Sequence, residues 1–166
     1  MGVTIATYID VRQRAVELDL GPVTDFAILP RGFGAGSPDG ALADETDATT
    51  IRKLLNEAGL SVQQLRRSDR ALPSVVQRSA DWIAPTLFVG SMFLSQNPHA
   101  IQLALGVMDS YISDFLKGRL SRGTVKLTIV VEKTRSREYR RVDYEGPPSG
   151  VKDLADVVRS VHDEPS

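Results

Sequence analysis

Twenty-seven consecutive residues in the middle of the chain, 82–108, contain no Asp, Glu, Lys or Arg, although a quarter of the whole chain is charged. Exposed surfaces of soluble proteins normally carry charged side chains. No stretch of the sequence reaches the roughly 18 to 20 continuous apolar residues of a membrane-spanning helix. We therefore expect this uncharged segment (residues 82–108) to be sequestered, either in the core or against another macromolecule.

The uncharged segment contains strong helix signals. Asn97 is a favourable N-cap, Pro98 a favourable first helical residue, and Gly118 a favourable stop. These signals predict a buried helical hairpin over residues 85–117, at the centre of the core. Its second helix has one apolar stripe and a second apolar stripe beside it, which predicts burial on more than one side. The stripes are Ile101, Leu105, Met108, Ile112 and Phe115, and Leu103, Val107 and Tyr111.

Alternating apolar residues predict strands near both ends of the chain. At the N-terminal end the pattern covers residues 3–9, and residues 23–29, which end at Pro30, predict a second strand. At the other end it predicts a C-terminal β-hairpin over 124–144, followed by a short amphipathic helix over 151–161. A chain of 166 residues fits one domain, so we expect a single globular α+β domain over 1–166.

The connecting regions are less regular. A stretch rich in Gly and Asp, residues 31–47, predicts a flexible loop. The next apolar positions predict a helix over 49–58 that ends at Gly59, and two further short helices over 62–69 and 73–83.

One of these connecting regions carries a family resemblance. Residues 54–67 resemble the core of the helix-turn-helix family, with two leucines, the turn glycine Gly59, an apolar residue and a serine. The resemblance implies that the second helix would carry Arg66, Arg67 and Arg70 towards DNA phosphates.

The residue types that carry most enzyme chemistry are scarce. The chain has no cysteine and only two histidines, His99 and His162, neither at ligand spacing to another metal-binding residue. The Gly-rich stretch 31–37 follows a predicted strand, as phosphate-binding loops do, but acidic residues rather than a helix follow it. We therefore expect a non-enzymatic protein with no catalytic residue, metal site, cofactor or small-molecule ligand.

Charge is unevenly distributed along a chain of formal net charge −1. Residues 117–141, the basic segment, hold nine basic and two acidic side chains and directly follow the apolar middle. Interface centres are enriched in arginine and aromatic residues. The candidate interaction residues are therefore Trp82, Phe88, Met92, Phe93, Arg135, Arg137, Arg140 and Arg141.

These observations lead to one functional expectation and one alternative. We expect an interaction or adaptor protein, or a subunit of a bacterial multi-protein assembly, that binds a protein partner or itself as a homo-oligomer through apolar surface of the middle segment. The alternative is a protein that binds an anionic membrane or nucleic acid through the basic segment. The bias towards arginine over lysine is typical of G+C-rich bacterial genomes. No secretory signal is recognisable over residues 1–20, so we expect a cytoplasmic location.

Overall fold

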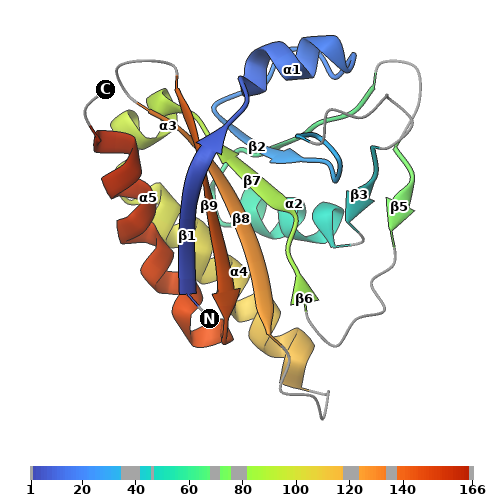
Figure 1. Ribbon diagram of the computed structural model, residues 1–166. Helices are drawn as coiled ribbons and strands as arrows, with labels where there is room; N and C mark the ends of the chain where they lie inside the picture. Colours follow the sequence, from blue (N-terminus) through green and yellow to red (C-terminus); the bar gives the residue numbers. More distant parts are fainter. Residues whose placement is uncertain are drawn as a thin grey trace.

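The computed structural model is a mixed β-sheet of seven strands with most of its helices packed against one face (Figure 1). The structure describes residues 2–34, 42–45, 47–67, 72–75, 82–117, 124–133 and 138–164. In chain order the elements are β1 (Gly2–Tyr8), α1 (Val11–Glu17), β2 (Phe26–Leu29), β3 (Asp44–Glu45), α2 (Ala48–Glu57), β4 (Gln63–Gln64), β5 (Ser74–Val75), β6 (Trp82–Ile83), β7 (Thr86–Val89), α3 (Ser91–Gln96), α4 (Ala100–Lys117), β8 (Val125–Glu132), β9 (Tyr139–Gly146), the 3₁₀ helix η2 (Pro148–Asp153) and α5 (Leu154–Asp163).

The sheet brings the two ends of the chain together. Its strand order is β1-β9-β8-β7-β2-β4, and β6 also pairs with β8. The pairs β1–β9, β9–β8 and β7–β2 are antiparallel, whereas β8–β7, β8–β6 and β2–β4 are parallel. The predicted α+β class is confirmed, as are the N-terminal strands, the C-terminal β-hairpin and the helix that follows it.

The prediction of a helical hairpin over the whole of residues 85–117 is wrong at its start. Residues 86–89 form β7, a central strand between β8 and β2, and the helices α3 and α4 begin only at Ser91. The side chains of Leu87 and Val89 are buried on the helix-covered face and Phe88 on the opposite face. A short strand buried on both faces has no alternation of apolar and polar residues, so periodicity does not distinguish it from a buried helix.

The predicted helices over 62–69 and 73–83 are also wrong in the parts of these ranges that the structure describes. Residues 63–64 form β4, which runs parallel to β2, and residues 82–83 form β6, which pairs with β8. The helix-turn-helix resemblance therefore stops at its first helix, because the chain becomes extended after Gly59. Arg70 lies outside the described residues.

The predicted loop over 31–47 is tied to the fold at its described ends. The backbone N–H of Arg31 donates to the carbonyl of Ala43 at 2.7 Å, and the N–H of Ala43 donates back at 3.2 Å. Glu45 lies in β3, which pairs with β5. Residues 35–41 lie outside the described residues, so the flexibility of this loop stays a prediction.

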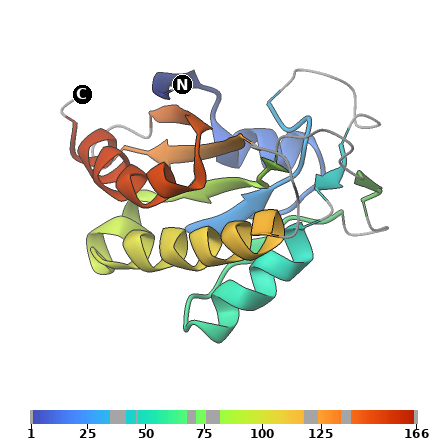
Figure 2. The same ribbon diagram turned by 90° about the horizontal axis from the view of Figure 1, so that it is seen from below.

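Two apolar layers lie on the two faces of the sheet. On one face, α2, α4 and α5 cover the strands (Figure 2). Of the first stripe of α4, Ile101, Leu105, Met108 and Ile112 are buried there, and the side chain of Phe115 lies outside the described residues. On the other face, α1 and the side chains of Phe33 and Leu42 cover only one end of the sheet. No helix in the described part of the chain has the length and apolar character needed to cross a bilayer.

Candidate functional site

Thirteen of the 27 residues of the uncharged segment are buried, and the others are half-buried or exposed. Of the predicted interaction residues, Trp82 is 1% exposed and Phe88 is fully buried. Phe93 is half-buried and stacks on Phe26 with ring centroids 4.6 Å apart. Met92, with 53% of its surface exposed, is the one of these four apolar side chains that faces solvent to a large extent. The structure therefore does not bring these four residues together on one surface.

Three cations of the basic segment, Lys133, Arg140 and Arg141, lie beside carboxylates. Arg140 pairs with Glu138 at 3.0 Å, and Arg141 pairs with Asp143 at 2.8 Å. Arg135 and Arg137 lie outside the described residues. The alternative function through the basic segment therefore stays a prediction, and these neighbouring carboxylates weaken the positive field that anionic lipid or nucleic acid requires.

The exposed residues of the uncharged segment lie in α3, in the turn over residues 97–99 and on the outer face of α4. Between Ala100 and Met108 this helix contains no charged residue, although a surface helix usually has a charged outer face. The second apolar stripe of α4 lies here: Leu103 is 47% exposed, while Val107 and Tyr111 are half-buried. The expectation that α4 is buried on more than one side is confirmed in part: Val107 and Tyr111 pack against the core, whereas Leu103 stays exposed.

Helix α2 packs beside α4 (Figure 2). A groove lies between α2 and the part of the second stripe formed by Val107 and Tyr111. Its volume is about 660 Å³. We call it the α2–α4 groove; its lining residues are Leu54, Glu57, Ala58, Val107, Ser110, Tyr111 and Asp114. Apolar and small side chains form most of this lining, and among the described lining residues the charged groups are the carboxylates of Glu57 and Asp114. The groove therefore combines an apolar surface with negative charge.

One carboxylate fixes the aromatic wall of the groove. Tyr111 Oη donates a hydrogen bond to Asp47 Oδ1 at 2.7 Å, and Trp82 Nε1 donates to Asp47 Oδ2 at 2.8 Å. The two rings lie 6.1 Å apart between centroids. Burial, and then the bond to Asp47, raise the pKa of the Tyr111 hydroxyl above its ordinary value. Trp82, a predicted interaction residue, thus contributes to the groove by positioning its wall and not by contacting solvent.

Sequence reasoning missed Tyr111, Leu54 and Asp47 as site residues. The second stripe of α4 was the signal that could have found Tyr111. No sequence pattern identified α2 as the helix beside that stripe, because this neighbour is decided by how the two helices pack on the sheet.

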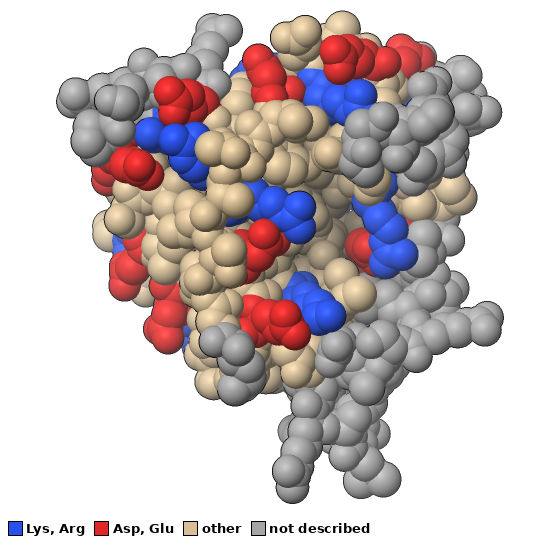
Figure 3. Space-filling view, viewed as in Figure 1, with Lys and Arg blue, Asp and Glu red and all other residues tan. Residues whose placement is uncertain are grey.

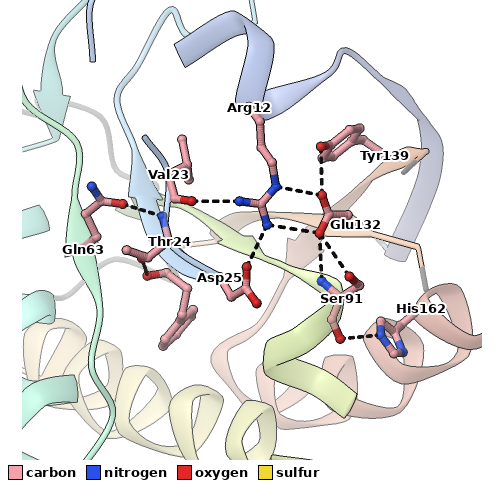
Figure 4. A network of polar contacts seen from close by, with 10 residues as sticks. Arg12, Val23, Thr24, Asp25, Gln63, Ser91, Glu132, Tyr139 and His162 are labelled. Carbon is pink, nitrogen blue, oxygen red and sulfur yellow. Dashed lines mark hydrogen bonds and ion pairs between the residues drawn. The ribbon is translucent and has the colours of Figure 1, made fainter. Parts of the chain in front are cut away.

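The most extensive polar network of the described residues surrounds Glu132, which is buried (Figure 4). Its carboxylate accepts hydrogen bonds from Arg12 Nε at 3.0 Å, from the Ser91 N–H at 3.0 Å and from Tyr139 Oη at 2.8 Å. Burial alone would raise the pKa of Glu132, but these hydrogen bonds outweigh it and lower the pKa to about 2. Arg12 also bonds Asp25 at 2.7 Å, so the network joins α1, β8, β9 and α3 to the start of β2.

This network resembles a set of catalytic groups in residue type but not in geometry. Ser91 Oγ lies 3.2 Å from Glu132 Oε1, to which it donates. His162 Nε2 lies 3.0 Å from the carbonyl oxygen of Ser91 and not from its hydroxyl. Ser91 and His162 therefore do not form a hydrogen-bonded pair of nucleophile and base. We interpret the network as a structural link between elements.

The part of the sheet that α1 leaves uncovered forms a hollow of about 670 Å³, visible near the centre of Figure 3. Positive and negative side chains alternate around it. Arg31 makes two hydrogen bonds to Glu45, at 2.7 and 2.9 Å, and Asp143 accepts from both Arg141 and Thr128. In each pair the positive and the negative side chain neutralise each other. The hollow is therefore neither a positive nor a negative surface.

Within the described residues, no group of three or more His, Asp or Glu side chains is placed to hold a metal ion. Comparisons with protein-family models, curated proteins and solved structures find no match for this chain.

Proposed function

We propose that this chain is a non-enzymatic interaction subunit that binds an amphipathic helix of a partner protein in the α2–α4 groove. The observation that carries the proposal is the second apolar stripe of α4, which the chain itself leaves partly exposed. Burial of apolar surface is the main favourable term in protein association. A partner helix in the groove that covers Val107 and Tyr111 would remove from water apolar surface that this chain leaves half-buried.

The shape of the groove favours a helix as the occupant. Helix-in-groove recognition places apolar side chains at positions i, i+3 or i+4 and i+7 into a groove between elements. The small side chains of Ala58 and Ser110 leave room for a helix to approach closely. The carboxylates of Glu57 and Asp114 favour basic residues beside the apolar anchors, because opposite charges across an interface increase specificity and association rate.

A peptide probe and two matched variants test this proposal. The probe is a helical peptide with leucines at positions i, i+4 and i+7 and lysines on both flanks; its control carries glutamates in place of the lysines. Ser110 and Ser113 are both exposed on α4, but only Ser110 lines the groove. Ser110→Arg should weaken binding of the lysine peptide at least about tenfold, a difference of roughly 1.4 kcal/mol, and Ser113→Arg should leave it unchanged.

Isothermal titration calorimetry measures both affinities, and far-UV circular dichroism checks that the variants fold. We expect the glutamate peptide to bind more weakly than the lysine peptide. Two results would contradict the proposal: no binding of the lysine peptide at concentrations up to about 1 mM, or equal loss of binding in both arginine variants.

A further inference from the structure

Exposed apolar side chains gather at one edge of the sheet, far along the chain from the groove. Val3 is 43% exposed and Ile5 is 49% exposed, and Ile9 directly after β1 is also exposed. All seven residues of β1 are exposed or half-buried. This strand therefore leaves accessible the β-branched side chains that strands normally bury.

β1 is also an edge strand. It pairs with β9 along its whole length, from Gly2 opposite Glu145 to Tyr8 opposite Tyr139, and among the described residues no strand pairs with its other side. The opposite edge of the sheet differs, because its strand β4 has only two residues. Figure 1 shows β1 as a long ribbon at the margin of the sheet.

The sequence of β1 contains none of the features that usually protect an edge. Proteins prevent edge-to-edge pairing with charged side chains, prolines, bulges or a covering element. The strand Gly2–Tyr8 reads GVTIATY, with no charged residue and no proline. Its pairing with β9 is continuous over seven residues, so no bulge twists it away.

We propose that β1 pairs antiparallel with β1 of a second copy of this chain, with the two-fold axis at Ile5. Centring the pair on Ile5 aligns all seven residues and places Val3 opposite Thr7 of the second copy. In an antiparallel pair, opposed residues lie on the same face. Val3 and Ile5 of both copies therefore form one apolar row on the helix-covered face of a continuous sheet.

Self-pairing is favoured over pairing with an unrelated strand because the edge is self-complementary. A two-fold interface brings the same patch together from both copies, and this patch holds no charge that would repel itself. On the other face, Thr4 lies beside Asp143 and Ala6 lies beside Arg141. Since Thr4 of one copy would face Ala6 of the second, the row that holds Asp143 in one sheet continues into the row that holds Arg141 in the other.

Cysteine cross-linking tests this pairing directly, because the chain has no cysteine of its own. Directly opposed residues of antiparallel strands have Cα atoms about 4.5–5.5 Å apart, within the range of a disulfide. Ile5→Cys should form a covalent dimer under mild oxidation. Val16→Cys is the matched control, since Val16 is an exposed valine on α1 and not on the edge.

Sedimentation velocity provides the second arm. The chain should be a dimer at micromolar concentration, and Ile5→Lys should raise the dimer dissociation constant at least about tenfold, since like charges opposed across strands are unfavourable. Val16→Lys should leave it unchanged, and circular dichroism confirms that both variants fold. A monomeric wild-type chain, a dimer that persists in Ile5→Lys, or a dimer in which Ile5→Cys fails to cross-link would each overturn the proposal. None of these outcomes bears on the α2–α4 groove, which Ser110→Arg tests separately.

Discussion

The carboxylate of Asp47 connects the core of this protein to its surface. One of its oxygens accepts from the buried Trp82 and the other from Tyr111 in the groove wall. If Asp47 were lost, the buried donor of Trp82 would have no hydrogen-bond partner, and the fold would be destabilised by the free energy of desolvating that donor. The Tyr111 ring is therefore held in position before any partner arrives, which reduces the ordering cost of binding.

Glu132 should make the stability of the fold depend on acidic pH. Its pKa is about 2, below its ordinary value of 4.5, because hydrogen bonds favour the ionised form in the folded state. The resulting stabilisation is fully present above pH 4.5 and is lost as the pH falls through about 2. Glu132→Gln should lower the free energy of unfolding at neutral pH by about 3 kcal/mol, and the difference from wild type should shrink as the pH falls.

Urea unfolding followed by the fluorescence of Trp82, the single tryptophan, measures this difference between neutral and acidic pH. Asp114→Asn on the exposed side of α4 is the control and should change stability by less than about 0.5 kcal/mol. A Glu132→Gln penalty that stays constant across the pH range would show that the carboxylate is not the source of the dependence.

At the scale of elements, alanine substitutions of one glycine at the end of α2 and one glycine inside α4 should change the stability of the fold in opposite directions. Gly59 ends α2 with a φ of 93°, and Gly106 lies inside α4. An added Cβ would have no heavy atom within 4 Å at either position, so backbone conformation alone decides the outcome. Gly59→Ala should destabilise the fold by about 1–2 kcal/mol, because the left-handed region is unfavourable for alanine. Gly106→Ala should stabilise it by about 0.5–1 kcal/mol, because alanine is the better helix former.

Thermal unfolding of both variants measures these shifts, and wild type provides the reference. Equal shifts of the same sign would contradict the assigned backbone conformations. Since Gly106 also lies on the outer face of α4, the stabilised variant provides a well-folded background for further binding measurements.

The elements with local signals could be predicted from the sequence. Alternation predicted β8 and β9, helical spacing predicted α2 and α5, and Gly59 marked the end of α2. β7 was assigned to a helix because both of its faces are buried and its pattern does not alternate. β4 was missed because two residues are too few for a pattern, and only pairing with β2 makes them a strand.

At the scale of the whole molecule, the candidate site could be predicted only in part. The width of the apolar band on α4 predicted that something covers its second stripe. The sequence does not indicate whether this stripe is covered by the chain itself or by a partner, because α2 and α4 meet only through the packing of both helices on the sheet. Likewise, no local signal predicts that β1 lies at an edge, since that depends on its pairing with β9 at the far end of the chain.

The whole molecule therefore presents two separate candidate surfaces, the α2–α4 groove for a partner helix and the β1 edge for a second copy. Their separation allows both to be occupied at once, as an adaptor within an assembly requires. Avidity from two copies would then strengthen binding to a partner that is itself multivalent.

Site-specific photo-crosslinking in lysate of the source organism tests the central proposal, a partner helix in the α2–α4 groove, most directly. A photoreactive phenylalanine analogue replaces Ser110 in one variant and Ser113 in the other, and adducts are resolved by mass. The proposal predicts a discrete adduct with a second protein species at position 110 and none at position 113. Adducts of equal yield at both positions, or none at either, would contradict it.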